Sequence, residues 1–232
     1  AKALNIIEDI NKPNDLLGIS YIKAINKLNS KIEPITIKRT SDYHDTYSTS
    51  SIISASNIRQ KLINKEDISP YLPSYSLTSI IEFDEDKLLT LLKFKILTDK
   101  DLSAYLDVDE GIEFRLLKVV NQTKTLDELI QNVKTKRYTY NKISRMLTHI
   151  LIGLTKKDAH QATMDYLKIL GFSKEGQSYL KKIRKDLDLP TTPIKDSLIY
   201  KYELLSSSIF EQITKISTYS FDFQNKPIQP EK

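Results

Sequence analysis

From Asp84 onward, one amphipathic helical segment follows another, and this succession limits what the chain can fold into. Several segments begin with Asp, Ser or Thr, which are preferred helix N-caps. Only 5 glycines occur in 232 residues, so composition also favours helix over sheet. The segments are DEDKLLTLLKFKIL (84–97), DEGIEFRLLKVV (109–120), TLDELIQNV (125–133), TYNKISRMLTHILIGL (139–154) and SKEGQSYLKKIRKDL (173–187). We expect a helical bundle here.

The N-terminal part mixes helical and strand-like patterns. In order, we expect a helix over 16–28 behind the start signal PND (13–15), a strand over 33–39 (EPITIKR), a polar loop over 40–51, and a helix that follows Ser54 and closes near Asn64. Pro70 and Pro73 then interrupt any continuous helix. The expectation is a mainly α protein with a small α/β part, divided into domains 1–66 and 67–222 and a flexible tail, 223–232.

Composition excludes several classes of function. The chain has 0 cysteines, which excludes disulfides and thiolate metal sites, and its three histidines, His44, His149 and His160, are too scattered to suggest a zinc site. No apolar run approaches the roughly 20 residues that span a bilayer. A reducing cytoplasm fits these features. The net charge of +5 suits a polyanionic partner without demanding one.

The stretch ISASNIRQKL (53–62) is a candidate anion site. Small residues at a helix start expose backbone N–H groups to an anion, and the helix dipole adds favourable potential. Ser54, Ser56 and Arg59 would then face the same phosphate. The other interpretation is a plain helix cap with a solvated arginine, and the hexapeptide SASNIR alone favours this interpretation because caps of this type are common.

A basic segment lies between Glu128 and Asp158, where no acidic residue occurs. Helical spacing over 139–154 places Lys142, Arg145 and His149 opposite an apolar stripe, with Tyr138 one turn before. Such a face could follow RNA phosphates and offer a ring to an unpaired base. An ordinary solvated face with Tyr138 and Tyr140 packed inward is the alternative. The candidate RNA-binding residues are Lys134, Lys136, Arg137, Tyr138, Lys142 and Arg145.

Two further features have mainly structural interpretations. His44, in DYHD, could shuttle a proton, although a histidine in a polar loop more often holds the shape of the loop. Asp109 and Glu110 precede a helix, and we interpret them as acids that match the helix dipole and not as a metal site.

Three motifs together resemble a known family. KPNDLLGISYIKAI (12–25), IKRTSDYHD (37–45) and ISASNIR (53–59) are similar, in order and spacing, to the closing part of the nucleotidyltransferase domain of the bacterial tRNA(Met) cytidine acetate ligases. The resemblance continues through 107–116, 134–154 and 166–180, to about Pro190. It implies a Rossmann-like nucleotidyltransferase piece followed by a helical, tRNA-binding domain.

The resemblance also implies an activity. Members of this family use ATP, with Mg²⁺, to activate acetate as acetyl-adenylate, and they acetylate N4 of the wobble cytidine of elongator tRNA(Met). By position, Asn14 resembles the family's adenosine contact and Arg39 its phosphate-side contact. Ser54, Ser56 and Arg59 join this ATP site through the anion-site reasoning.

This sequence departs from the family in one main respect. It contains no His-x-Gly-His signature, which in the family cradles the ATP phosphates on the first strand. We therefore expect a C-terminal portion whose own catalysis is in doubt. The alternatives are a non-catalytic helical RNA-binding or interaction module and an adenylyltransferase of small mononucleotides. A smaller departure is Asp15, where relatives often carry a second Asn.

Overall fold

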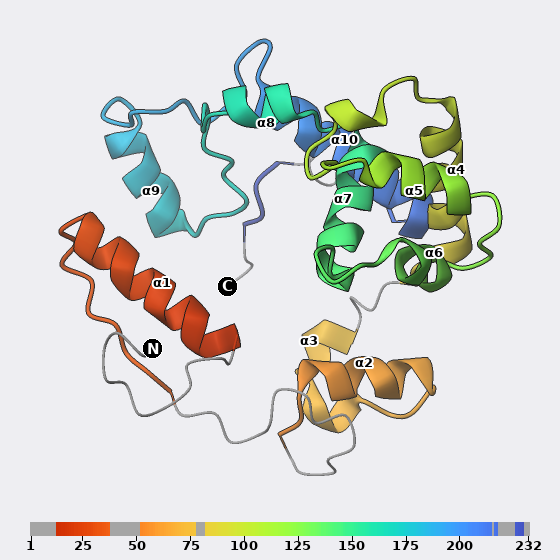
Figure 1. The fold of residues 1–232 in the computed structure, drawn as a ribbon. Coiled ribbons are helices and arrows are strands. Elements are labelled where there is room, and N and C mark those ends of the chain that lie inside the picture. Colours follow the sequence, from red (N-terminus) through yellow and green to blue (C-terminus); the bar gives the residue numbers. More distant parts are fainter. Residues whose placement is uncertain (1–12, 38–51, 78–81, 215, 218–225, 230–232) are drawn as a thin grey trace, which may run out of the picture. The chain divides into compact units, whose positions relative to one another are not determined.

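The computed structural model describes residues 13–37, 52–77, 82–214, 216–217 and 226–229, and the chain divides into two compact units, 1–79 and 80–232. Figure 1 shows the described elements of both units, which are helical. The helix-rich character expected from the sequence is confirmed. In the part of the chain that the structure describes, no helix is long and apolar enough to cross a membrane.

The first unit contains α1 (Pro13–Lys27), α2 (Ala55–Ile63), a 3-10 turn η2 (Ser69–Tyr71) and the short α3 (Ser74–Leu77). Both expected helices are confirmed. Proline suits the first position of α1, where the backbone N–H has no helical partner anyway. The sequence also predicted the start and the end of α2 correctly, since Ser54 is its N-cap and Asn64 its C-cap.

The strand predicted over 33–39 is wrong for the residues that can be described. Residues 33–37 are not in a strand, and 38 and 39 lie outside the described residues, as does the predicted loop 40–51. Alternating side chains form a strand only when a neighbouring backbone supplies hydrogen bonds. Among the described residues, the isolated β-bridges lie elsewhere, at Tyr105–Thr155 and Gly171–Ile228.

The boundary between the two units lies later than expected, at residue 79 and not at 66. The proline-containing segment folds back toward α2. Lys61 of α2 forms an ion pair of 2.7 Å with Glu66, and its ammonium lies 5.8 Å from the centre of the Tyr71 ring. Ile68 is buried. Pro70 lies within η2 and Pro73 directly precedes α3, so neither proline marks the start of the second unit.

The second unit contains every helix that the sequence predicted in it. Asp84, Thr125, Thr139 and Ser173 each accept a hydrogen bond at the expected N-cap position. The elements are α4 (Glu85–Thr98), η3 (Leu102–Ala104), α5 (Ile112–Val119), α6 (Leu126–Val133), α7 (Tyr140–Ile152), α8 (Lys156–Gln161), α9 (Lys174–Ile183) and α10 (Leu198–Thr214). The sequence reasoning missed α8 and α10.

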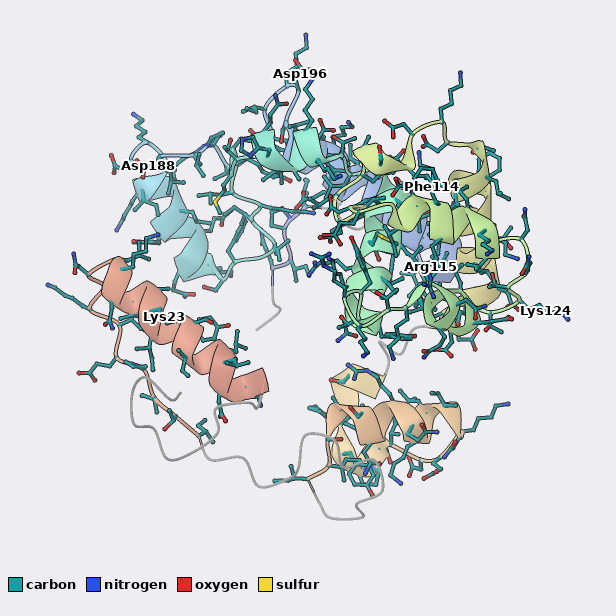
Figure 2. The ribbon with its side chains drawn as sticks, viewed as in Figure 1. Lys23, Phe114, Arg115, Lys124, Asp188 and Asp196 are labelled. Atoms are coloured by element: carbon teal, nitrogen blue, oxygen red, sulfur yellow. The ribbon has the colours of Figure 1, made fainter. Side chains whose placement is uncertain are left out.

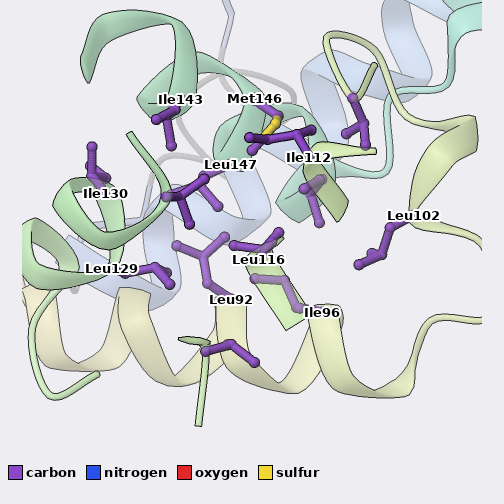
Figure 3. Close-up of a cluster of buried hydrophobic side chains, with 14 of the residues drawn as sticks. Leu92, Ile96, Leu102, Ile112, Leu116, Leu129, Ile130, Ile143, Met146 and Leu147 are labelled. Carbon is purple, nitrogen blue, oxygen red and sulfur yellow. The ribbon is translucent and has the colours of Figure 1, made fainter. Parts of the chain in front are cut away.

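One hydrophobic core holds α4, α5, α6 and α7 together (Figure 3). The inward stripe predicted for α7 is present, because Ile143, Leu147 and Ile150 are buried. Burying a side chain of this size contributes about 1.5–3 kcal/mol. α10 packs on α4 and α7, and the Asp84 amide donates to the Ile213 carbonyl at 2.8 Å. The core is thus closed by a helix from the far end of the chain.

The sequence predicted a flexible tail over 223–232, but the part of it that the structure describes forms backbone hydrogen bonds. Residue 228 forms a parallel bridge with Gly171: the Ile228 amide donates to the Leu170 carbonyl at 2.9 Å, and the Phe172 amide donates to the Ile228 carbonyl at 3.0 Å. Residues 226–229 are thereby held against the segment before α9. The expectation of a flexible tail was based on composition, which does not reveal these two backbone hydrogen bonds.

Candidate functional site

Ser54 is the structural cap of α2. Its backbone is extended (φ −73°, ψ 156°) and its hydroxyl accepts the Asn57 amide at 3.0 Å. The helical ladder begins with the Ile58 amide on the Ser54 carbonyl. The side chain is 2% exposed, so its hydroxyl is committed to the inside of the turn. A single serine therefore satisfies the capping requirement.

The remaining N-terminal groups of α2 form the candidate anion site. Within the described residues, no acceptor is assigned to the amides of Ala55 and Ser56. Arg59 is exposed and lies three and four residues after them, so its side chain begins one turn from the free end of the helix. Long side chains on a helix lean toward its N-terminus. Two amides, the dipole and one guanidinium can thus meet the same anion.

The other two predicted nucleotide contacts are not brought to α2 by the described structure. Asn14 is exposed in the first turn of α1. Arg39 lies outside the described residues, as does His44, the candidate proton shuttle. Their assignment to the nucleotide site stays a prediction.

Acidic residues from one short loop neutralise much of the basic segment. The loop lies between η3 and α5, and each of its three acids pairs with a base near α7. Arg145 donates to Asp107 at 2.7 and 3.1 Å, Arg137 pairs with Glu110 at 3.0 Å, and Lys156 pairs with Asp109 at 2.8 Å. The basic segment therefore carries less unpaired positive charge than its lack of acidic residues between Glu128 and Asp158 suggested.

Asp107 is the centre of these contacts. Hydrogen bonds from the Arg145 guanidinium hold the pKa of the Asp107 carboxyl below its usual value, with nearby His149 and Lys142 adding to the effect. The His149 Nδ1 atom lies 3.1 Å from Asp107 Oδ2. The predicted face of Lys142, Arg145 and His149 therefore exists, but it is turned toward a carboxylate of the protein itself.

Asp109 and Glu110 differ from their predicted role. Helix α5 begins at Ile112 with Gly111 as its N-cap, so both acids lie before the cap and not in the first turn. The chain reverses there through left-handed residues, with φ +59° at Glu110 and +78° at Gly111. Their side chains instead pair with Arg137 and Lys156.

The prediction that Tyr138 offers an exposed ring to a base is wrong. The residue is 4% exposed, and its hydroxyl donates to the Asp109 carbonyl at 2.8 Å. The Lys142 ammonium lies 3.9 Å from the centre of the ring. The inward packing considered as the alternative holds for Tyr138, while Tyr140 is partly exposed. Tyr138 therefore fixes the loop before α5 to the start of α7.

Lys134 and Lys136 are the predicted RNA-binding cations that keep their charge available. Both are exposed, and within the described residues neither has an ion-pair partner. The position of Lys134 is fixed by Arg115, labelled in Figure 2, whose guanidinium donates to the Asn132 and Lys134 carbonyls at 3.1 and 3.3 Å. Arg115 thereby satisfies the end of α6.

Sequence reasoning missed the acidic loop as a partner of the basic segment. Asp107 lies 38 positions before Arg145, and no local periodicity connects the two residues. The only available signal was the run DVDEG (107–111), in which acids alternate with an apolar residue ahead of a glycine.

Comparisons with known proteins agree with the resemblance stated above. Residues 1–225 match the family model described as HIGH Nucleotidyl Transferase. Proteins named tRNA(Met) cytidine acetate ligase are similar: that of Bacillus mycoides is 34% identical over 78% of this chain and 51% of its own length, and that of a Geobacillus species is 33% identical over 95% and 61%. The chain thus spans about half to three fifths of these relatives.

A solved structure shares the fold. The crystal structure of Thermotoga maritima TmcAL bound with alpha-thio ATP has a TM-score of 0.72 and 23% identity, covering 94% of this chain and 59% of that one.

Proposed function

The chain belongs to the HIGH nucleotidyl transferase family, and from this membership we propose that it contributes to an ATP-dependent ligase that modifies tRNA. In this proposal, acetate and ATP give acetyl-adenylate, and the acetyl group passes to N4 of the wobble cytidine of elongator tRNA(Met) in the cytoplasm. The observation that carries the proposal is the 33% identity over 95% of the chain to a protein named tRNA(Met) cytidine acetate ligase.

The N-terminus of α2 supports an ATP phosphate contact. The amides of Ala55 and Ser56 belong to the open N-terminal end of α2, and Arg59 follows one turn later, an arrangement that suits an anion. A related protein is named as bound with alpha-thio ATP. Ser54 would act by shaping this turn, and Asn14 and Arg39 would contact the nucleotide from their own segments.

We assign no Mg²⁺ ligand to this chain. Among the described residues, no group of three or more His, Asp or Glu side chains could hold a metal ion. In this proposal, Mg²⁺ accompanies the phosphates of the ATP substrate.

The basic segment supports a tRNA contact that involves fewer residues than the sequence predicted. Lys134 and Lys136 would provide the phosphate contacts, because their ammonium groups are exposed. Arg137 is well exposed beside Glu110 and could exchange that partner for a phosphate, while Lys142 and Arg145 would act mainly by holding the local structure. Tyr138 is not part of the proposal.

The test measures adenylate chemistry and RNA modification separately. Acetate-dependent conversion of ATP to AMP is followed by chromatography, and N4-acetylcytidine in digested tRNA is followed by mass spectrometry. Both assays use the 232-residue chain and the same chain fused to the portion of the Geobacillus relative that the alignment leaves uncovered. We expect both products from the fusion.

The same assays separate the alternatives. RNA binding without AMP formation, by the chain and the fusion alike, would identify a non-catalytic RNA-binding module. Nucleotidyl transfer to a small mononucleotide, with no change in tRNA, would identify the adenylyltransferase. Either result would overturn the ligase proposal.

A further inference from the structure

The second unit contains a pocket that the assigned functional residues do not touch. Its volume is about 920 Å³, within the usual range for small-molecule and cofactor sites. α9 forms one side. The other walls come from the loop after α9 and from the C-terminal residues, so segments far apart in sequence enclose it.

Backbone hydrogen bonds hold these walls in place. The Leu167 amide donates to the Pro190 carbonyl at 2.8 Å, which ties down the loop that brings Thr191 and Thr192 to the pocket. The bridge between Gly171 and Ile228 holds Pro227 at the opposite wall. A Cβ atom at residue 171 would lie 2.8 Å from the Ile228 carbonyl oxygen, so this approach requires glycine. The pocket is therefore built by specific contacts.

The lining combines an apolar surface with polar groups. Ile169, Phe172, Leu180 and Leu187 provide the apolar part. The Gln177 amide can donate and accept hydrogen bonds, as the edge of a nucleobase does. Aromatic and apolar faces with a few hydrogen-bonding groups are typical of sites that hold unstacked RNA bases.

Positive charge is concentrated beside this lining. Lys174, Lys181 and Arg184 recur at helical spacing and share one face of α9, and Lys181 and Arg184 line the pocket. All three are exposed, and in the part of the chain that the structure describes none forms an ion pair. Glu175 lies about 100° around the helix axis from Lys174, Asp186 and Asp188 follow the end of α9, and none of these three acids lines the pocket.

We propose that the α9 face and its pocket bind an unpaired nucleotide of an RNA, with the base in the pocket and the flanking phosphates on Lys181 and Arg184. The contrast with the 134–157 segment supports this, because three bases of that segment are paired with carboxylates while the α9 cations are not. The choice of RNA rests on the proposed function, and the charge and lining of α9 identify where the RNA lies.

The test measures RNA binding to the 232-residue chain by fluorescence anisotropy. The probes are the anticodon stem-loop of elongator tRNA(Met) and a blunt RNA duplex of the same length. Lys181→Ala with Arg184→Ala should weaken stem-loop binding about tenfold or more and reduce the salt slope by about 2. Lys118→Ala with Lys182→Ala is the control, since it removes the same charge from exposed positions outside the pocket.

A second variant tests entry of a base. Gln177→Trp fills the pocket without changing charge, and it should remove the preference for the stem-loop over the duplex while duplex binding persists. Thr192→Trp, from the loop after α9, provides the same test if the first variant fails to fold. Circular dichroism melting confirms that each variant is folded.

The possible results are distinct. Equal losses in the charge variant and its control, or an unchanged stem-loop preference in both tryptophan variants, would overturn the inference. Competition by AMP, CMP or inorganic phosphate at the concentration of the RNA would also overturn it, in favour of a small-ligand site. Failure of the unaltered chain to bind either RNA would overturn both this inference and the tRNA contact of the proposed function. RNA binding that survives Lys181→Ala with Arg184→Ala would overturn the inference alone.

Discussion

Arg145 of α7 and Asp107 of the loop before α5 form a two-bonded ion pair, with Nε–Oδ2 at 2.7 Å and Nη2–Oδ1 at 3.1 Å. Asp107 adopts a left-handed backbone conformation (φ +66°), and its carboxylate accepts both bonds from α7. A planar guanidinium matches a carboxylate in a way that an ammonium cannot. The pair therefore fixes the loop to α7. Arg145, which the sequence predicted to bind RNA, has a structural role here.

Arg145→Ala should lower the thermal midpoint by about 2–4 °C, the scale expected for losing one such contact in a domain of this size. Arg145→Lys should restore only part of it, because a point charge replaces the fork. RNA affinity should change less than twofold, whereas Lys136→Ala should weaken it without changing the midpoint. If Arg145→Lys kept full RNA affinity and Arg145→Ala lost it at unchanged stability, Arg145 would be an RNA contact after all.

Asp99 should make the folding stability of the second unit sensitive to acid. Burial alone would raise the pKa of its carboxyl, but hydrogen bonds from Lys95 and Tyr105 lower the pKa to about 2. A lowered pKa stabilises the folded state above the unfolded-state pKa of about 4, and this contribution disappears as the pH falls toward about 2. The urea midpoint should fall across that window.

Asp99→Asn supplies the comparison, since it removes the titrating group and retains an acceptor for Tyr105. Its urea midpoint should be lower at neutral pH and should decline less steeply between about pH 4 and pH 2. If the urea midpoints of the two proteins declined equally steeply between about pH 4 and pH 2, Asp99 would not contribute to the loss of stability in acid.

The helices could be predicted because their signals are local. Thr125, Thr139 and Ser173 mark helix starts by side-chain hydrogen bonds within three residues, and the apolar spacing of α7 identifies its buried face directly. α10 was missed although Ser197, directly before it, accepts the Tyr200 amide at 3.0 Å as an N-cap does, because the serines at 206–208 weaken its apolar pattern. Its position depends on tertiary packing against α4 and α7.

The candidate site was less predictable because it depends on contacts between distant residues. Tyr138 precedes the N-cap Thr139, so a helical projection cannot place its ring, and its hydrogen bond to Asp109 decides the orientation. The charge of the basic segment likewise depends on acids from another loop. On α9, sequence spacing alone could have placed Lys174 and Lys181 on one face, but it could not have shown the pocket.

Hydrogen exchange should differ between the two units. Large apolar side chains of α1 are exposed, including Leu16 at 53% and Tyr21 at 61%, whereas the core side chains of α4 and α7 are buried. Protection reflects the free energy of local opening, which is small where few apolar contacts hold a helix. Amides of α1 should exchange faster than those of α7, as measured by mass spectrometry of peptides. Equal protection would mean that another surface covers α1 in solution.

Two variants at the start of α2 separate its capping role from its proposed ATP contact. Ser54→Ala should lower stability by about 1 kcal/mol, because the Asn57 amide loses its acceptor. Arg59→Gln keeps helix propensity and most of the side-chain length, so the thermal midpoint should stay nearly unchanged. The two effects should therefore appear in different measurements.

Acetate-dependent AMP formation by the fusion protein provides the second measurement. Arg59→Gln should reduce its rate by about 10- to 100-fold, the scale expected for losing one charge that stabilises a phosphate. Lys23→Gln, which removes one exposed cation from α1, is the matched control and should leave the rate unchanged. A normal rate together with lowered stability in Arg59→Gln would assign Arg59 to the fold, and the start of α2 would then be only a capped helix.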